Sequence, residues 1–324
     1  MRHYQKSPLS PPEQIQKLKH RGLVINDDAL ATSCLSTIGF YRLSAYFIPF
    51  EDKQNTQVQH AFVPGTTFDQ ILFLYTFDRR LRLLVLEALE RIEISIRSLW
   101  ADALCAKYNN AHAYMDSNYF KDPWTHQKAL TKAARNIQDS NEQFIQHYLG
   151  TYKQPFMPPT WVMTQTLSFG GLSHWYAATK DNQVKLHAAK AVGLPTSDIA
   201  VDVLHSLTMV RNTCAHHARL WNRQFTMQLP HIKKLKSHLH IHKINVINTK
   251  DVEEIQQQPD RRLYNHLVVI SHMMKAIQPT TGWQTRLVSE ILTLTPRQKM
   301  AMGFPDHWQT MPFWEGALQQ AQSG

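Results

Sequence analysis

The residues best suited to chemistry lie close together in one stretch of the chain, residues 210–223, which is rich in arginine, asparagine and histidine. Within it, Arg211, Asn212 and His216 form the pattern R-N-x-x-x-H. Histidine exchanges protons near neutral pH because its unperturbed pKa is about 6.5. Arginine offers a fixed fork of N–H donors that matches phosphate oxygens. These residue types favour proton transfer at a phosphate group, and the remaining chain is expected to act as their scaffold.

One helix is predicted to carry this stretch. Residues 193–198 supply a stop, a cap and an acidic first turn, so the helix should begin near Asp198. Arg211 and His216 are five positions apart, so their side chains differ in direction by about 140° on a regular helix. They are expected to flank a cleft, and two copies of the helix facing each other would place both pairs around one phosphate. We therefore expect a homodimer. The inward face of the helix is predicted to be Val203, Leu204, Leu207, Val210 and Cys214.

The longest helix should run from Phe68 to about Tyr108, because apolar residues recur at helical spacing over many turns. Thr66 or Thr67 is suited to cap its start. Two i,i+4 ion pairs on this helix, which we interpret as ordinary support at its surface, are Glu87 with Arg91 and Glu93 with Arg97.

Capping residues and helix breakers mark the other elements. Ser10, Pro11 and Glu13 predict a capping box at the start of the first helix. Asn26 and Asp27 predict a second helix that runs to about residue 37. Further helices are expected to begin after Asp122 and Thr160, at 172–179 after a break at Gly170 and Gly171, and at 264–277 and 285–294.

Several segments, in a shared order, resemble one known family. Besides R-N-x-x-x-H they are residues 14–23 (QIQKLKHRGL), 38–46 (IGFYRLSAY), 77–82 (FDRRLR), 167–173 (LSFGGLS) and 302–308 (MGFPDHW). The chain is similar to the Abi_2 family of AbiD/AbiF-like abortive-infection proteins, which act in bacterial phage resistance, and to the HEPN superfamily of ribonucleases. This resemblance implies an all-α fold, with a HEPN-like helical bundle, a long central helix and helical N-terminal and C-terminal extensions.

The expected domain organisation has three parts. Residues 1–60 form an N-terminal helical segment packed on the core, residues 65–230 form the HEPN-like core with the R-N-x-x-x-H motif, and residues 231–324 form a C-terminal helical extension. The composition of the last part differs, because lysines and histidines alternate after Pro230.

The resemblance also implies a metal-independent endoribonuclease without a cofactor. His216 is expected to act as general acid and base, and Arg211 to bind the phosphate and its transition state. Asn212 is expected to orient one of them or the scissile phosphate. RNA, from the host or the phage, would be cut by attack of its 2′-OH, leaving 2′,3′-cyclic phosphate ends. A noncoding-RNA or protein antidote, as in toxin-antitoxin systems, is a further expected partner.

RNA contacts are expected from other cationic and polar residues, although the arginines beside the motif are equally suited to pair with acids of the long helix. Three cations within one turn, at residues 79–82, also require an anion or a carboxylate nearby. The expected RNA-binding residues are His217, Arg219, Asn222, Arg223, Arg79 and Arg80.

Composition supports a polyanionic partner. The chain has 35 Lys and Arg against 25 Asp and Glu, a formal net charge of +10. Its three cysteines are scattered without a CxxC pair, which argues against a disulfide framework and favours a reducing cytoplasm. No signal peptide and no run of about 18 apolar residues is present, so no membrane association is expected.

No metal site is predicted from the sequence. Two groups of candidate ligands lack the spacing of known zinc sites: Cys214, His216 and His217, and His238, His240 and His242.

Three alternatives stay open from the residues. Arg211 and His216 are also suited to a buried structural network with Glu87, Glu90 or Glu93. A non-catalytic RNA-binding HEPN module that regulates or scaffolds a defence system would keep the same shape. A DNA-binding regulator rests on the short N-terminal helix pair, whose second helix carries no Arg or Lys at residues 28–37.

Overall fold

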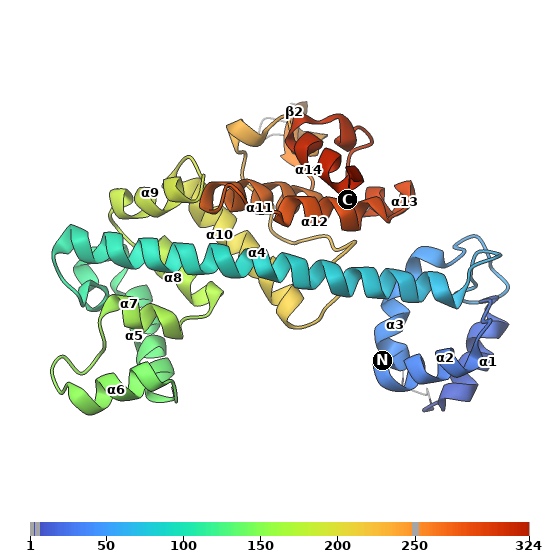
Figure 1. Ribbon diagram of the computed structural model, residues 1–324, viewed down its shortest axis with the longest axis horizontal. Coiled ribbons are helices and arrows are strands. Elements are labelled where there is room, and N and C mark those ends of the chain that lie inside the picture. The colour runs from blue at the N-terminus through green and yellow to red at the C-terminus, as the bar shows by residue number, and fades with distance from the viewer. Residues whose placement is uncertain (1–2, 4–6, 248–252, 324) are drawn as a thin grey trace. The chain divides into compact units, whose positions relative to one another are not determined.

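Helices make up most of the structure, and among the described residues a single two-stranded sheet is the exception. The computed structural model describes residues 3, 7–247 and 253–323. The chain divides into two compact units, Met1–Arg80 and Leu81–Gly324, whose elements are labelled in Figure 1. The expected all-α class is confirmed.

The first unit contains short helices and the start of a long one. Its elements are α1 Pro11–His20, α2 Asp28–Cys34, a π-helical turn Leu35–Gly39, α3 Phe40–Phe47, a 3-10 turn Ile48–Phe50 and the first turns of α4 Phe68–Tyr108. The Ser10 backbone N–H donates to Glu13 Oε2 at 2.7 Å, which confirms the predicted capping box. The helix expected to reach about residue 37 ends at Cys34. After the π-helical turn, the φ of +90° at Gly39 lets α3 start in a new direction.

A buried hydrogen bond fixes α3 against the start of α4. The Tyr46 hydroxyl donates to Asp78 Oδ2 at 2.6 Å, and both residues are buried. A carboxylate taken out of water requires such donors. The acid within the arginine-rich turn is thus used inside the first unit.

The second unit continues α4 and adds the remaining elements in sequence. They are α5 Pro123–Gln138, α6 Gln143–Thr151, α7 Thr160–Met163, α8 Phe169–Ala178, α9 Asn182–Ala191, α10 Ser197–Ala215, β1 Ile241–Ile247, β2 Glu253–Pro259, α11 Leu263–Ile277, α12 Trp283–Leu292, α13 Pro296–Ala301 and α14 Pro312–Ser323. Short 3-10 turns lie at Ala113–Met115, Ser117–Tyr119, Thr164–Thr166, Lys233–Leu235 and Trp308–Thr310.

The long helix α4 has the predicted limits (Figure 1). In the second unit, hydrogen bonds join it to the residue after α8 and to α12. Thr67 and Gln70 cap its start reciprocally, with backbone-to-side-chain distances of 3.1 and 3.3 Å. The Trp100 indole N–H donates to Thr179 Oγ1, just after α8, at 2.9 Å. On another side, the Trp283 indole N–H of α12 donates to the Leu84 carbonyl oxygen at 2.7 Å. The α4 residues that are fully buried in the second unit include Val85, Ala88, Leu89, Ile92, Ile96, Trp100 and Leu104.

Helix α11 is buried on all sides from Leu263 to Ser271, and its buried residues are mostly apolar. His266 on α11 shares a hydrogen bond with Ser206 on α10, with 2.9 Å between Nε2 and Oγ. Complete burial lowers the pKa of His266 to about 4, so its imidazole is neutral at neutral pH. Helix α10 is therefore held from the side of α11 by a polar contact inside the core.

Two local predictions were wrong. Gly170 and Gly171 do not break a helix but lie in the first turn of α8, where the Gly171 N–H donates to the Ser168 hydroxyl at 3.2 Å. Thr160 is the first residue of α7 rather than its cap, because its hydroxyl instead donates to the Ala111 carbonyl oxygen. The region after Pro230 includes an antiparallel hairpin, in which Ile241 lies opposite Pro259.

Candidate functional site

The predicted motif lies at the carboxyl end of α10. Thr196 caps the start of α10 by accepting from the Ile199 N–H at 3.2 Å, which agrees with the predicted start near Asp198. The predicted inward face is buried throughout. Gly170 lets α8 pack closely beside it, since a Cβ at that position would lie 3.2 Å from Thr208 Cγ2. The core thus fixes the last turn of α10, where Arg211 and Asn212 project.

The helix ends before the motif does. Its last residue is Ala215, and His216 is the C-cap residue. His217 adopts a left-handed backbone with φ of +55°, and the Ala218 N–H donates back to the Thr213 carbonyl oxygen at 3.0 Å. The expectation that residues 217–223 continue the helix is therefore wrong. A left-handed residue closes the helix here as a glycine usually does, and histidine tolerates that conformation better than most side chains.

The His216 ring is accessible to a ligand. The residue is exposed, and among the described parts of the chain its ring makes no hydrogen bond. His216 is therefore not part of a buried structural network, which contradicts that alternative for this residue.

Arg211 is held by two neighbours. Its Nη1 donates to Asn212 Oδ1 at 3.3 Å, and its Nε lies 3.8 Å from Glu93 Oε2 on α4. The alternative of a structural network with an acid of α4 therefore agrees with the structure for Arg211, whose acidic partner is Glu93. The arginine side chain is nonetheless 32% exposed, so part of the guanidinium group is reachable from solvent.

Glu93 joins a second arginine to this network. Arg97 Nη2 donates to Glu93 Oε1 at 2.5 Å and to the Leu167 carbonyl oxygen at 2.9 Å. The Glu93 and Arg97 side chains are only 11% and 13% exposed, so the prediction of an ordinary surface pair is wrong. Burial raises the pKa of Glu93, while the charges of Arg97 and Arg211 oppose that rise. One buried carboxylate therefore positions two guanidinium groups.

A cavity of about 560 Å³ lies over this network. Glu87 on its wall is paired with Arg286 and Arg91, at 2.6 and 3.0 Å. Its rim includes Leu83 and Ile94, which are 56% and 54% exposed. Carboxylates, guanidinium groups and apolar side chains thus alternate in one cavity, a mixture suited to a protein surface as much as to RNA. Its lining residues are Leu83, Leu86, Glu87, Glu90, Glu93, Ile94, Arg97 and Arg211.

The segment after His216 is irregular but anchored. Leu220, Trp221 and Phe225 are buried in the core. The predicted RNA-binding residues lie between or before these anchors: Arg219 and Asn222 are half-buried, and His217 and Arg223 are exposed. The buried Asn222 Oδ1 accepts no hydrogen bond from the described residues.

The other two predicted RNA-binding residues, Arg79 and Arg80, belong to the first unit. Both lie on α4, where Arg79 is exposed and Arg80 is half-buried. Their role in RNA binding stays a prediction.

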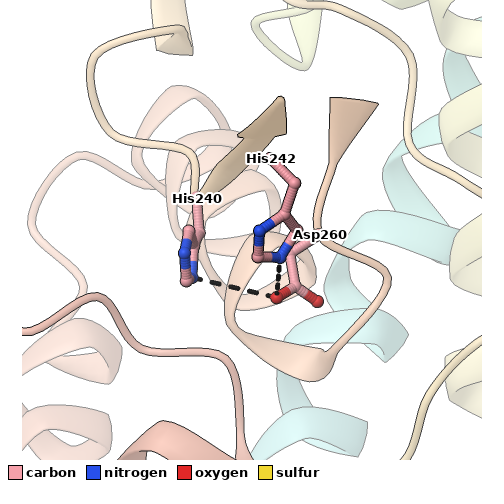
Figure 2. A group of neighbouring side chains, drawn as sticks. All are labelled: His240, His242 and Asp260. Carbon is pink, nitrogen blue, oxygen red and sulfur yellow. Dashed lines mark hydrogen bonds and ion pairs between the residues drawn. The ribbon is translucent and has the colours of Figure 1, made fainter. Parts of the chain in front are cut away.

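A separate cluster, which sequence spacing did not reveal, joins His240 and His242 to Asp260 (Figure 2). The His242 Nε2 atom lies 2.7 Å from Asp260 Oδ2, and His240 Nδ1 lies 3.8 Å from the same oxygen. The strand pairing of β1 with β2 brings the acid to the histidines, and this pairing is not visible in the spacing of either segment alone.

The comparisons identify the family. The model of the Abi-like protein family matches residues 33–222, which is more than half of the chain. The chain belongs to the Abi-like protein family, as the sequence resemblance predicted, and thereby to the proteins of abortive infection, a form of phage defence. The matched range includes α10 and the whole R-N-x-x-x-H pattern, whereas residues 14–23 and 302–308 lie outside it. No curated protein and no solved structure matches the chain significantly.

Among the described residues, none of the helices is both long enough and apolar enough to cross a membrane.

Glu93→Gln tests the network that positions Arg211. The substitution preserves the shape but leaves the nearly buried Arg97 guanidinium group without its carboxylate. Burial opposes the ionised Glu93 and offsets part of this effect, so we expect a loss of about 1–3 kcal/mol in the free energy of unfolding at neutral pH. Chemical denaturation measures it. The exposed Glu315→Gln on α14 is the matched control and should change stability by less than about 0.5 kcal/mol. Equal losses in the two variants would contradict a special role for Glu93.

Proposed function

We propose that this member of the Abi-like family is a metal-independent endoribonuclease of the HEPN type. The observation that carries the proposal is the end of α10, where Arg211 is held by Asn212 and His216 is exposed directly after the helix. RNA cleavage without a metal requires proton transfer, which an accessible imidazole provides, and stabilisation of negative charge, which a fixed guanidinium group provides. Family membership in abortive infection supports a reaction that is harmful to an infected cell.

The reaction proceeds by attack of the RNA 2′-OH on the adjacent phosphorus. His216 accepts the 2′-OH proton, and a protonated His216 donates a proton to the 5′-oxygen as the P–O5′ bond breaks. Arg211 binds the non-bridging oxygens, whose negative charge grows in the pentavalent transition state. The products carry a 2′,3′-cyclic phosphate and a 5′-hydroxyl group, so atoms and charge balance without a cofactor.

A homodimer supplies the two histidines that this scheme uses, one as base and one as acid. One copy of the chain offers a single histidine at the end of this motif, His216 at the C-cap of α10, whereas the scheme uses one histidine as base and one as acid. The cavity over Glu93 is suited to a second copy of the chain, because it presents carboxylates and arginines together with exposed Leu83 and Ile94. In a two-fold dimer the same face of each copy meets the other, so carboxylates of one copy are able to pair with arginines of the second and apolar groups with apolar groups.

The domains, the RNA-binding residues and an antidote each have a role in this proposed reaction. Residues 65–230 form the catalytic core, and residues 1–60 and 231–324 are extensions of it. RNA binding extends over His217, Arg219, Asn222 and Arg223. An antidote, either a noncoding RNA or a protein, restrains the enzyme before infection.

The catalytic proposal is tested by incubating end-labelled bacterial RNA with the purified protein in excess chelator. Unmodified protein should cleave the RNA, and His216→Ala should slow cleavage by about 10²–10⁴-fold because proton transfer is lost. Arg211→Ala should slow it by about 10²–10³-fold because charge stabilisation is lost. His231→Ala, which removes an exposed histidine outside the motif, is the matched control and should cleave at the original rate.

Equal cleavage by the unmodified, His216→Ala and Arg211→Ala proteins would contradict the assignment of the motif. If all variants bind RNA equally and none cleaves it, the non-catalytic RNA-binding module becomes the better description. Unchanged circular dichroism spectra and melting temperatures establish that each variant is folded.

The dimer is tested through Ile94→Glu, which adds charge to the proposed interface at an exposed position. Unmodified protein should sediment with a mass near twice the 37.6 kDa of one chain, and the variant near one chain. The rate of RNA cleavage by the Ile94→Glu variant should fall together with its sedimentation mass. Leu149→Glu changes another exposed apolar residue and should preserve both properties. A monomeric unmodified protein that still cleaves RNA would contradict the two-copy site.

A further inference from the structure

A second cavity, of about 400 Å³, lies beyond the residues matched by the family model. It is within the lower range of small-ligand sites, which are typically about 300–1,000 Å³. Its walls come from the segment that follows α10 and from the two ends of the β1–β2 hairpin. The lining residues are Gln224, His242, Gln258, Pro259, Asp260, Arg261 and Arg262.

The Asp260 carboxylate in this cavity is already fully engaged. Its Oδ2 accepts from Arg262 Nε at 2.8 Å and from Arg262 Nη2, and it lies 2.7 Å from His242 Nε2. Its Oδ1 accepts from the Arg262 backbone N–H at 2.7 Å. Although burial alone would raise it, the hydrogen bonds and the Arg262 charge hold the pKa of Asp260 at about 2. The acid is therefore ionised, and Arg262 neutralises its charge.

The same contacts make the cluster of Figure 2 a poor metal site. A divalent cation would compete with the Arg262 guanidinium group for Asp260 Oδ2 and would be repelled by it. His240 Nδ1 is engaged as well, because it lies 2.7 Å from the Gly303 carbonyl oxygen. Arg262 completes its own hydrogen bonds by donating Nη1 to the Met300 carbonyl oxygen at 2.6 Å. Asp260 and Arg262 thus form a neutral, cross-linked wall.

Arg261 adds a positive charge to this cavity that Asp260 does not neutralise, because Asp260 is bound by Arg262. Its backbone is fixed, since the Phe225 N–H donates to its carbonyl oxygen at 2.9 Å, while its side chain is exposed. Among the described residues, the Arg261 side chain has no carboxylate partner. Gln224 and Gln258 add amide donors, and the His242 side chain is 48% exposed beside them. An exposed guanidinium group beside amide donors in a concave wall is suited to an anion, and above all to phosphate.

The chain connects this cavity to the proposed catalytic residues. Residues 216–225 run from the C-cap of α10 to Phe225, which is hydrogen-bonded to Arg261. Gln224, within this segment, forms an isolated antiparallel bridge with Arg262. Arg219 and Arg223 lie on the same segment. Cationic residues are thus distributed along the whole connection, as a strand of RNA backbone would require.

We propose that the cavity around Arg261 binds a backbone phosphate group of the RNA substrate, away from the phosphate that is cleaved. The inference rests on the proposed function, because it takes the substrate to be RNA. It gives the C-terminal extension a role in holding the substrate. Phosphate contacts fix register without reading sequence, so this site contributes affinity rather than base specificity.

The test measures binding of a mixed-sequence, single-stranded oligoribonucleotide to the full chain carrying His216→Ala, with fluorescence anisotropy at several salt concentrations. Adding Arg261→Gln should weaken binding about tenfold, which corresponds to the loss of one charge-assisted contact. The slope of log K against log salt should become shallower by about 0.7, as expected for one phosphate contact on a single strand. Gln224→Glu, which adds a negative charge to the cavity, should weaken binding by at least as much.

Arg297→Gln removes an exposed arginine from α13 and is the matched control, so its affinity and slope should equal those of the parent. Equal affinity and slope for Arg261→Gln and its parent would overturn the proposal, and so would a complete absence of RNA binding by the parent. A zinc-dependent rise in melting temperature that His240→Ala abolishes would make the cluster a metal centre and would also overturn it. Because binding is measured in the His216→Ala background, a failure of the unmodified protein to cleave RNA would refute the nuclease proposal without deciding this one.

Discussion

The buried carboxylate of Glu93 is the interaction on which the candidate site depends. Two guanidinium groups, those of Arg97 on α4 and Arg211 on α10, lie against it, and the nearly buried Arg97 requires a negative charge nearby. Arg97 also donates to the Leu167 carbonyl oxygen, so the guanidinium group that Glu93 positions ties α4 to the turn before α8. The position of Arg211, and with it the contact to Asn212, follows from a charge requirement inside the protein.

The end of α10 adds the second constraint. A left-handed residue at 217 stops the helix directly after Arg211 and Asn212 and leaves His216 as an exposed C-cap residue. The preceding turns are immobilised by a buried apolar face and by the contact between Ser206 and His266. The proposed reaction uses the exposed His216 together with the held Arg211 guanidinium group. Rigid support from the core allows that arrangement to persist without a ligand.

Local sequence signals predicted much of this fold. The limits of α4, the capping box of α1 and the start of α10 depend on residues a few positions apart, and the structure agrees with them. The ordered motifs indicated the family, and that resemblance implied the all-α class. The arginine, asparagine and histidine of the motif were also visible at once, although their catalytic roles stay proposals.

Features that depend on distant residues escaped prediction. Glu93 and Arg97 have ordinary surface spacing, and only the packing of α10 and the turn before α8 buries them. The glycines at 170 and 171 resemble a break, yet both lie in the first turn of α8, and Gly170 allows the close approach of α8 to α10. Asp260 meets its histidines only through strand pairing. Sequence spacing reports the secondary structure of each segment, whereas tertiary contacts decide which charges are buried.

The most direct test of the account uses a short RNA with one mapped cleavage position, in which the 2′-hydroxyl of that single nucleotide is replaced by hydrogen. Incubated with the purified protein in excess chelator, the substituted RNA should bind normally and stay intact, because the attacking group is missing. The unsubstituted RNA should yield a 2′,3′-cyclic phosphate that mass spectrometry detects. Cleavage of both RNAs at the same rate would contradict the proposed mechanism.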